Sequence, residues 1–456
     1  MARDTLDATP IESRDELVAW LEQGNKAEAQ FRIGTEHEKI PFTLGRHEPV
    51  PYEGDKGIRA VLEGMQAVTG WEPIMDGPHI IGLADPVGGG AISLEPGGQF
   101  ELSGAPLATI HETCAEINTH LTHLRTVADP LGLGFLGIGM SPKWSRSETP
   151  VMPKGRYKIM AAYMPKVGNL GLDMMFRTCT VQVNLDFSSE RDMVRKLRAS
   201  LALQPIATAL FANSPFTEGK PNGFLSFRSE IWRDTDADRS GMLPFAFEDG
   251  MGFERYVDYA LDVPMYFVKR GDHYIDVAGS SFRELLAGRH PALPGETATL
   301  SDWINHLSTI FPEVRLKRFL EMRGADAGPW CTLCALPALW TGLLYDETSL
   351  DACLDLVRDW SEEERQALRD DVPKLGLKAQ IRGRTVHEIA GEVVALARDA
   401  LTRRRRLDSQ GRDETRFLAP VDEVLKNGRT PAEDLLTQYF GPWGGTVEPI
   451  FTELAY

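Results

Sequence analysis

"RIGTEHEKI", residues 32–40, places Glu36 and Glu38 on either side of a histidine, in a segment otherwise typical of the start of a strand. Side chains alternate between the two faces of a strand, so both carboxylates point to one face and Thr35 and His37 to the other. Carboxylates this close repel each other unless a cation lies between them. This stretch therefore predicts a sheet with a polar, charge-bearing face.

Three further segments, residues 92–104, 177–187 and 315–326, show the same alternation. Their polar faces carry, in chain order, Ser93, Glu95, Gln99, Glu101, Ser103, Thr178, Thr180, Gln182, Asn184, Asp186, Glu321 and Arg323. Any one segment alone is explained by an antiparallel strand that turns its polar face to water. Together they are rich in carboxylate and amide oxygens, and Mg²⁺ binds such oxygens beside substrate phosphates. We interpret Glu36 and Glu38 as divalent-metal ligands on a sheet that holds a nucleotide.

Composition restricts the class of protein. The chain has 456 residues, of which 42% are hydrophobic and 25% charged, and its formal net charge is −17. These values are typical of a globular protein, and the negative charge argues against nucleic-acid binding, which needs a basic surface. Five cysteines are too few for a disulfide framework. No apolar run approaches the roughly 18 residues that span a bilayer, and the N-terminus lacks a targeting pattern, so we expect a cytoplasmic enzyme without membrane contact.

The pattern along the chain predicts an α+β protein. Strand-like alternation occupies residues 30–105 and 175–190, and residues 192–212 form an apolar helix that Pro205 is expected to break or kink. From about residue 350 the chain becomes charged and helical, with a capping pair at Ser361 and Glu364. We expect a catalytic core over residues 1–345 and a helical C-terminal portion, residues 346–456, packed on it as one unit.

Positive charge for a phosphate site is available in two places. Residues 142–168 concentrate Lys143, Arg146, Lys154, Arg156, Lys158 and Lys166 in an otherwise acidic chain, and their Pro and Gly residues predict a loop or lid. A solvated basic loop explains them equally well. Arg228 lies among apolar residues, which is typical of an arginine that binds a carboxylate through two parallel hydrogen bonds.

Three other motifs give no support to a nicotinamide site, a structural zinc site or a nucleophilic serine. The glycines of "GLGFLGIG", residues 132–139, have dinucleotide-fold spacing but follow a helix rather than a strand. Cys331 and Cys334 form a C-x-x-C, but no second pair lies at zinc-finger spacing. A nucleophilic serine is not indicated, because no G-x-S-x-G occurs.

Several long motifs together resemble one family. "GTEHEK", "LEPGGQFELSGAPL", "MPKGRYKIM", "RTCTVQVNLDF", "IFPEVRLKRFLEMRGAD" and "LTQYFGPWGGTVEPIF" are similar to the plant-type glutamate–cysteine ligases, a class shared by plants and many proteobacteria. The likeness runs from about residue 10 to the C-terminus. It implies the glutamine-synthetase-like carboxylate-amine ligase fold, in which helices surround an antiparallel sheet that forms a funnel for ATP, magnesium and substrate.

The resemblance also implies an activity, in which ATP drives the joining of the L-glutamate side-chain carboxylate to the amine of L-cysteine through γ-glutamyl phosphate. This is the first step of glutathione synthesis, by a monomer or a homodimer. The implied magnesium ligands are Glu36, Glu38, Glu95, Glu101 and Glu321, and the implied catalytic residues are Arg323, Glu38 and Gln182. The implied substrate-binding residues are Arg228 for the glutamate α-carboxylate, Thr180 and Asn184, and Arg156 and Lys166 for phosphate.

The cysteines match the family in part. Cys114 and Cys334 correspond to one regulatory disulfide of the plant enzymes and are a possible redox pair, although two free buried thiols are an equal alternative. Val277 and Ala292 stand where the second plant disulfide would lie. Two functional alternatives stay open: a γ-glutamyl ligase with another amine acceptor, and a non-catalytic nucleotide or glutamate sensor on the same fold.

Overall fold

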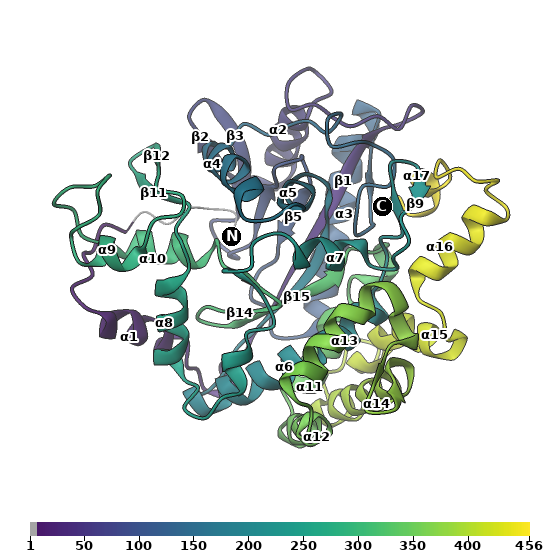
Figure 1. The fold of residues 1–456 in the computed structure, drawn as a ribbon. Helices are drawn as coiled ribbons and strands as arrows, with labels where there is room; N and C mark the ends of the chain where they lie inside the picture. The colour runs from purple at the N-terminus through teal and green to yellow at the C-terminus, as the bar shows by residue number, and fades with distance from the viewer. Residues whose placement is uncertain (1–6) are drawn as a thin grey trace.

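The segment that carries Glu36 and Glu38 forms β1 (Ile33–Thr43), a central strand of an antiparallel sheet (Figure 1). The computed structural model describes residues 7–456, and within them the strand order of this sheet is β14-β15-β7-β1-β5-β4-β3-β2, with β6 paired to the far half of β1. The other strands of the sheet are β2 (Glu72–Asp76), β3 (His79–Ala84), β4 (Ala91–Leu94), β5 (Phe100–Ser103), β6 (Leu133–Leu136), β7 (Thr180–Leu185), β14 (Val314–Leu316) and β15 (Leu320–Asp326).

The register of these strands brings the predicted polar residues together. Glu36 of β1 lies opposite Gln182 of β7 on one side and Ser103 of β5 on the other, and Glu38 lies opposite Glu101. In the same way, β15 is paired with the other edge of β7. Side chains opposite each other in an antiparallel pair are direct neighbours, so one face of the sheet collects charge from four segments that are distant in sequence.

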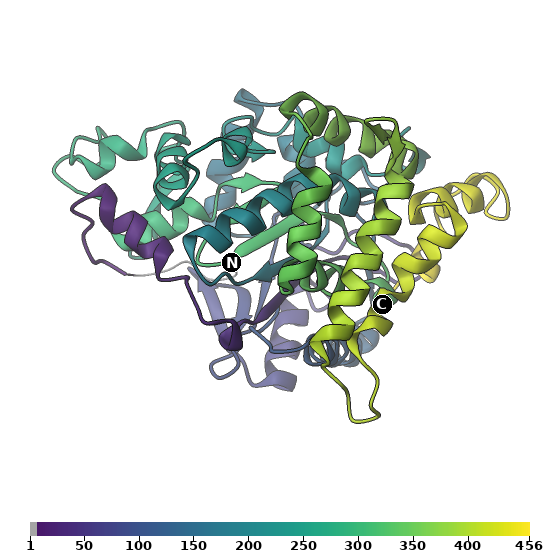
Figure 2. The same cartoon turned by 90° about the horizontal axis from the view of Figure 1, so that it is seen from below.

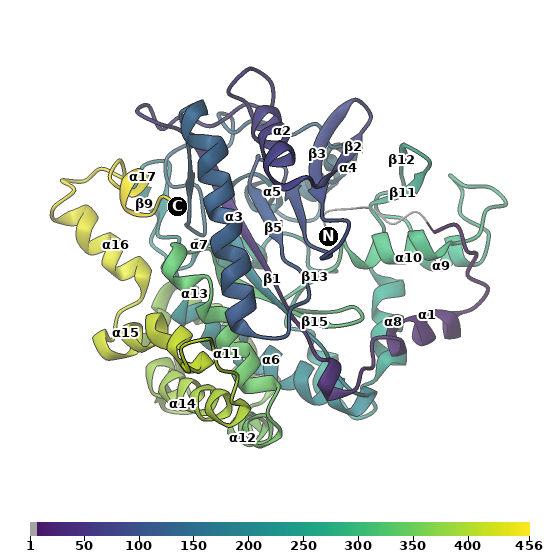
Figure 3. The ribbon, with the colours of Figure 1, turned by 180° about the vertical axis from the view of Figure 1, so that it is seen from behind.

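Helices cover the apolar face of the sheet. They are α2 (Ile58–Thr69), α3 (Ile110–Leu131), α6 (Glu190–Leu210) and α11 (Ala335–Leu344). Figure 3 shows α3 crossing in front of β1 beside α2, and α6 and α11 pack against β15 and β7. Val181, Val183 and Leu185 of β7 are buried in the core that these helices close.

Three short helices stand over the polar face, and the remaining elements lie further out. Those at the polar face are α4 (Gly155–Tyr163), α5 (Gly171–Arg177) and α7 (Phe227–Arg233). At one end of the molecule lie α1 (Arg14–Glu22), α8 (Phe253–Asp262), α9 (Phe282–Leu286) and α10 (Leu300–Leu307). The short strand pairs are β8 (Phe216–Thr217) with β9 (Lys220–Pro221), β10 (Ser240–Gly241) with β13 (Phe311–Pro312), β11 (Phe267–Arg270) with β12 (His273–Asp276), and β16 (Gln380–Ile381) with β17 (Arg384–Thr385).

The C-terminal part of the chain is helical, as predicted. It contains α12 (Glu347–Val357), α13 (Glu362–Leu375), α14 (Val386–Arg404), α15 (Ala419–Asn427), α16 (Pro431–Phe440) and α17 (Ile450–Glu453). Helices α12, α13 and α14 pack on α6 and α11 and share their apolar core, and Figure 2 shows α14 running beside α11 from below. The boundary at 345/346 stays a prediction.

Two local predictions need correction. Pro205 does not break the helix, because α6 continues through it to Leu210. The helix is buried from Ala199 to Leu210, and this packing outweighs the one backbone hydrogen bond that a proline cannot donate. The basic segment 142–168 is not all loop, since α4 begins at Gly155, whose N–H donates to the Asp76 carboxylate at 2.7 Å. The capping pair Ser361 and Glu364 is confirmed at the start of α13.

Within residues 7–456, none of the helices combines the length and the hydrophobicity that a membrane span requires.

The burial of β7 gives a stability prediction with a matched control. Val183 is 0% exposed, and Val87, in the loop before β4, is 93% exposed. We expect Val183→Ala to lower the free energy of unfolding by about 1.5–3 kcal/mol, because two buried methyl groups are lost and a cavity is left. Val87→Ala should leave it unchanged. Urea unfolding followed by circular dichroism measures both, and equal midpoints for the two variants would contradict the assigned core.

Candidate functional site

A cavity of about 800 Å³ opens on the polar face of the sheet. On the sheet side it is lined from β1, β5, β7 and β15, and on the other side from α4, α5, α7 and β13. Nine predicted site residues line it: Glu36, Glu38, Glu95, Glu101, Arg156, Thr180, Gln182, Arg228 and Arg323. We call it the carboxylate cavity.

The other three predicted site residues of the sheet and the basic segment lie elsewhere. Asn184 lines a second, neighbouring cavity of about 1210 Å³, the glycine-loop cavity, which is named for Gly89 and Gly90. Glu36 lines both cavities, which follow each other along the polar face of β1. Glu321 is fully buried beneath the carboxylate cavity, and Lys166 is exposed at the end of the short helix η2 (Met164–Lys166), away from both cavities.

The Glu36 carboxylate is buried and the Glu38 carboxylate is partly buried, and each has few hydrogen-bond partners. Glu36 accepts one hydrogen bond from the Asn184 amide at 2.9 Å, and Glu38 accepts one from the backbone N–H of Thr180 at 2.9 Å. Burial raises the pKa of Glu36 above its usual value, and the neighbouring charge of Glu321 adds to this effect. Burial also raises the pKa of Glu38 well above its usual value, with contributions from Glu95 and Glu101. A cation placed here would relieve both effects.

The donor set fits Mg²⁺ when phosphate completes it. Among residues 7–456, no three His, Cys, Asp or Glu side chains are close enough to form a metal site on their own. Magnesium usually takes only one or two carboxylates together with substrate phosphates, so a preassembled cluster is not required. A spare oxygen is present, because Asn184 Oδ1 is buried without a hydrogen-bond partner beside Glu36. Both carboxylate oxygens of Glu101 already accept hydrogen bonds, one from the hydroxyl of Ser93 and one from the hydroxyl of Ser103.

Glu321 is held by three cations instead. Its carboxylate pairs with Arg315 at 2.7 Å, with Lys317 at 2.8 Å and with Arg323, and its exposure is 0%. Burial opposes ionisation of this carboxyl, but Arg315, Lys317 and Arg323 outweigh it and hold its pKa well below the usual value. Both carboxylate oxygens are therefore occupied, and this geometry does not favour the predicted role of Glu321 as a metal ligand.

Two arginines of the cavity share an aromatic neighbour. The Cζ atoms of Arg228 and Arg323 each lie 5.9 Å from the ring centroid of Trp232, and Arg323 is also 5.7 Å from Phe311. Arg228 donates to the backbone carbonyl of Arg323 at 3.0 Å, and Arg323 donates to Gln182 Oε1 at 2.7 Å. Cation–π contacts and hydrogen bonds thus fix both guanidinium groups at the cavity wall.

Sequence reasoning missed the residues that complete this wall. They are Tyr157, Met160, Met174, Met175, Trp232, Phe311 and Arg315. A signal was available for Arg315, because β14 and β15 form a hairpin in which Arg315 lies opposite Glu321. The alternation of charged residues on either side of residues 317–319 could have predicted that pairing. Apart from Phe311 of β13, the aromatic and methionine residues come from helices α4, α5 and α7, whose position over the sheet has no sequence signal.

Comparison with known proteins assigns the family. The family model described as glutamate–cysteine ligase family 2 matches residues 32–453. The chain belongs to this family. It is 60% identical over 449 residues to a chloroplastic glutamate–cysteine ligase of Arabidopsis thaliana. That alignment covers 98% of this chain and 84% of the relative. It is 58% identical over 444 residues to the chloroplastic glutamate–cysteine ligase B of rice, Oryza sativa subsp. japonica, covering 97% and 87%.

The fold is also found among solved structures. A glutamate–cysteine ligase from Francisella tularensis, solved in complex with AMP, superposes with a TM-score of 0.55 at 12% identity, covering 94% of this chain and 88% of that one. At this identity the likeness concerns the fold alone. The predicted α+β ligase fold, the predicted family and the predicted enzyme class, glutamate–cysteine ligase, are confirmed.

The predicted cytoplasmic location is wrong on this comparison. The Arabidopsis and rice relatives, and those of tobacco and tomato at the same 60% identity, are all named chloroplastic. The expectation rested on the composition of the N-terminal segment, of which residues 1–6 lie outside the described structure.

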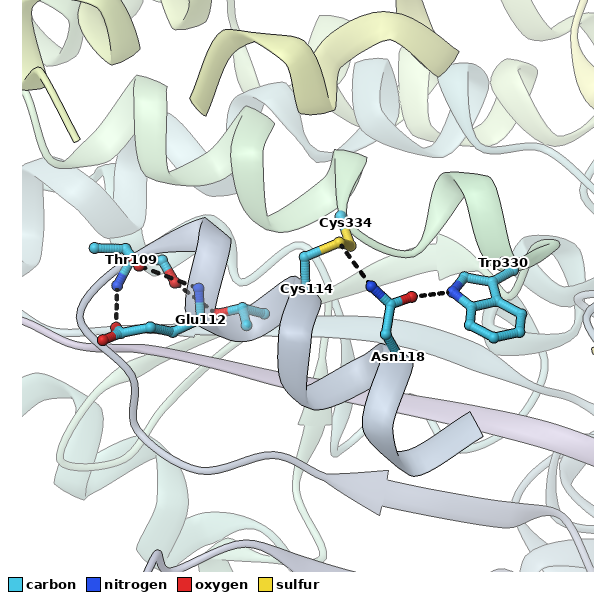
Figure 4. The surroundings of a disulfide bond; sticks show 7 residues. Thr109, Glu112, Cys114, Asn118, Trp330 and Cys334 are labelled. Atoms are coloured by element: carbon cyan, nitrogen blue, oxygen red, sulfur yellow. Dashed lines mark hydrogen bonds between the residues drawn. A yellow bond between two sulfur atoms is a disulfide. The ribbon is translucent and has the colours of Figure 1, made fainter. Parts of the chain in front are cut away.

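The structure joins Cys114 and Cys334 in a disulfide between α3 and the start of α11 (Figure 4). Cys114 follows the capping box of Thr109 and Glu112 by less than one turn. Asn118, one turn further along α3, accepts a hydrogen bond from Trp330 (Figure 4). A regulatory role of this pair stays a prediction.

The cation cluster around Glu321 can be tested by stability. We expect Glu321→Gln to lower the free energy of unfolding by about 3–5 kcal/mol, because Arg315, Lys317 and Arg323 would remain buried without their shared counter-charge. The matched control is Glu347→Gln, which removes an exposed ion pair with Arg195 and should cost no more than about 1 kcal/mol. Urea unfolding at neutral pH measures both. A Glu321→Gln variant as stable as the control would contradict the buried network.

Proposed function

We propose that this chain joins the γ-carboxylate of L-glutamate to the amine of L-cysteine with ATP, and so forms γ-glutamylcysteine for glutathione synthesis. A γ-carboxylate oxygen attacks the γ-phosphorus of ATP and ADP leaves; the amine then attacks the acyl carbon of γ-glutamyl phosphate and phosphate leaves. Membership of glutamate–cysteine ligase family 2 supports this reaction. The structural observation that carries it is the carboxylate cavity, where four glutamates face Arg228 and Arg323.

The first step must overcome repulsion between a carboxylate and a triphosphate. We propose that Glu36, Glu38, Glu95 and Glu101 bind Mg²⁺, with Asn184 Oδ1 as a further oxygen. When bound, Mg²⁺ would neutralise phosphate charge and orient the γ-phosphoryl group. Burial raises the pKa of Glu36 and of Glu38, which supports this assignment because a bound cation would stabilise the ionised form of both carboxyl groups. Glu321 we assign instead to the positioning of Arg323.

The two arginines have separate proposed roles. Arg323 stabilises the transferring phosphoryl group, and Gln182 holds its guanidinium in place by accepting from Nη1. Arg228 binds the α-carboxylate of glutamate. The buried Nε atom of Arg228 supports this role, because it has no hydrogen-bond partner in the described chain and can donate to a ligand. Thr180 lines the same wall, where its hydroxyl donates to the Ala325 carbonyl at 2.7 Å.

Phosphate contacts are proposed for Arg156 and for Lys166 on different grounds. Arg156 lines the carboxylate cavity from α4. Lys166 is exposed and its contact rests on the family resemblance. Because the glycine-loop cavity is the larger and meets the carboxylate cavity at Glu36, we place the bulk of ATP there, with its phosphates reaching Glu36.

The reaction is tested by measuring ADP release with ATP, Mg²⁺ and glutamate, with and without cysteine, and by identifying the product by mass. Cysteine-dependent ADP release with γ-glutamylcysteine as product supports the proposal. Turnover with 2-aminobutyrate or alanine but not with cysteine would assign another acceptor. No turnover with any amine, combined with nucleotide binding, would favour a sensor on the same fold.

Glu38→Gln tests one of the four carboxylates that we propose as ligands of Mg²⁺. We expect ADP release to fall by at least about 100-fold, because one oxygen ligand and one negative charge are lost at the metal. Circular dichroism should show an intact fold, since the amide is isosteric. The matched control is Glu72→Gln on exposed β2, which should keep full turnover. Near-normal ADP release by Glu38→Gln would remove Glu38 from the metal site.

A further inference from the structure

An exposed free thiol stands three residues from the disulfide. All five cysteines lie within the described chain: Cys114 and Cys334 are bonded to each other, Cys179 and Cys353 are buried, and Cys331 is exposed. Cys331 and Cys334 form the C-x-x-C sequence that the ligase reaction does not use. Because Cys331 is a free thiol beside an existing disulfide, this motif is suited to thiol–disulfide exchange.

The backbone brings Cys331 within bonding reach of Cys334. Cys331 lies in the short helix η4 (Trp330–Thr332), Leu333 and Cys334 continue in right-handed helical conformation, and Cys334 caps α11. The rise and turn of a helix place Cα atoms three residues apart about 5 Å from each other. A disulfide needs Cα atoms within roughly 4.4–6.8 Å, and the observed Cys114–Cys334 bond has 5.7 Å. The Cα spacing therefore permits a bond from Cys334 to Cys331 as well as to Cys114.

We propose that Cys331 is a resolving thiol that moves the disulfide from Cys114–Cys334 to Cys331–Cys334. The Cys331 thiolate attacks Sγ of Cys334, a Cys331–Cys334 bond forms, and the Cys114–Cys334 bond breaks. Cys114 leaves as a thiolate and takes up a proton from water. One disulfide is exchanged for another, so neither an oxidant nor a reductant is consumed.

The two remaining thiols do not compete for this reaction. Burial raises the pKa of Cys353 to about 12, and burial together with the charge of Glu38 raises the pKa of Cys179 well above its usual value. A thiol attacks a disulfide only as thiolate and only where it can reach it. Exposure thus singles out Cys331 among the three free cysteines.

The exchange changes what the disulfide constrains. The Cys114–Cys334 bond closes 220 residues and ties α3 to the start of α11, whereas a Cys331–Cys334 bond closes a single turn. Helix α3 packs on β1, which carries Glu36 and Glu38, and α11 packs on β7. Moving the bond releases α3 from α11 behind the strands that line the carboxylate cavity, while the rest of the chain keeps its covalent structure.

The exchange is measured by disulfide mapping on the full chain. Protein in the Cys114–Cys334 form is brought from acidic buffer to about pH 8 without added thiol, where thiolates form. Samples taken over time are quenched in acid, alkylated under denaturing conditions and digested with trypsin, which releases Cys114 in residues 60–125 and the other two cysteines in residues 324–358. We expect the cross-linked pair to decay by first-order kinetics independent of protein concentration, as residues 324–358 gain an internal disulfide.

Two variants and one control keep the proposal falsifiable. Cys331→Ser should retain the cross-linked pair throughout, and Cys353→Ala, which removes the third thiol of the same peptide, should behave as the unmodified chain. Cys114→Ser, treated with oxidised glutathione, should form the Cys331–Cys334 bond. The proposal is overturned if Cys114→Ser carries only mixed disulfides with glutathione, if the cross-linked pair is lost equally in Cys331→Ser, or if the rate scales with protein concentration.

Discussion

The compensation of buried charge is the constraint on which the rest of this structure depends. Glu321 is completely enclosed, and it is tolerated there because Arg315, Lys317 and Arg323 surround it. Glu36 and Glu38 lie on the same sheet face without such partners. One carboxylate thus balances the cations of the cavity floor, and we propose that the others bind a cation that arrives with substrate.

Antiparallel pairing makes this arrangement possible. Strands β1, β5, β7 and β15 come from segments up to nearly 300 residues apart, and their registers set the polar side chains side by side. The apolar side chains of the same strands enter the core beneath α3, α6 and α11. Charged cavity side chains and apolar core side chains are therefore alternate residues of the same strands, and the helices α4, α5 and α7 cover the charged face.

Much of the sheet was predictable because its signal is local. The two-residue alternation around Glu36 and around Gln182 placed the polar residues on one face before their neighbours were known, and the structure agrees. The helix break expected at Pro205 does not occur, because the packing of buried α6 outweighs the local helix-breaking preference of proline. Trp232 was missed for a similar reason, because its contact with Arg323 arises only when α7 lies over β15, although its contact with Arg228 lies within α7 itself.

The residues that share a strand face, the ligase family and the fold class could all be predicted from the sequence, because alternation and long motifs are properties of the chain. Which charges are already paired follows only from the folded arrangement of the strands. Glu321 and Glu38 are the same residue type on comparable strands, yet the pKa of one is lowered and that of the other is raised. The difference arises because the hairpin of β14 and β15 brings cations to Glu321, while Glu38 meets other carboxylates. Electrostatic energy depends on distance and burial, and neither is set by residue type.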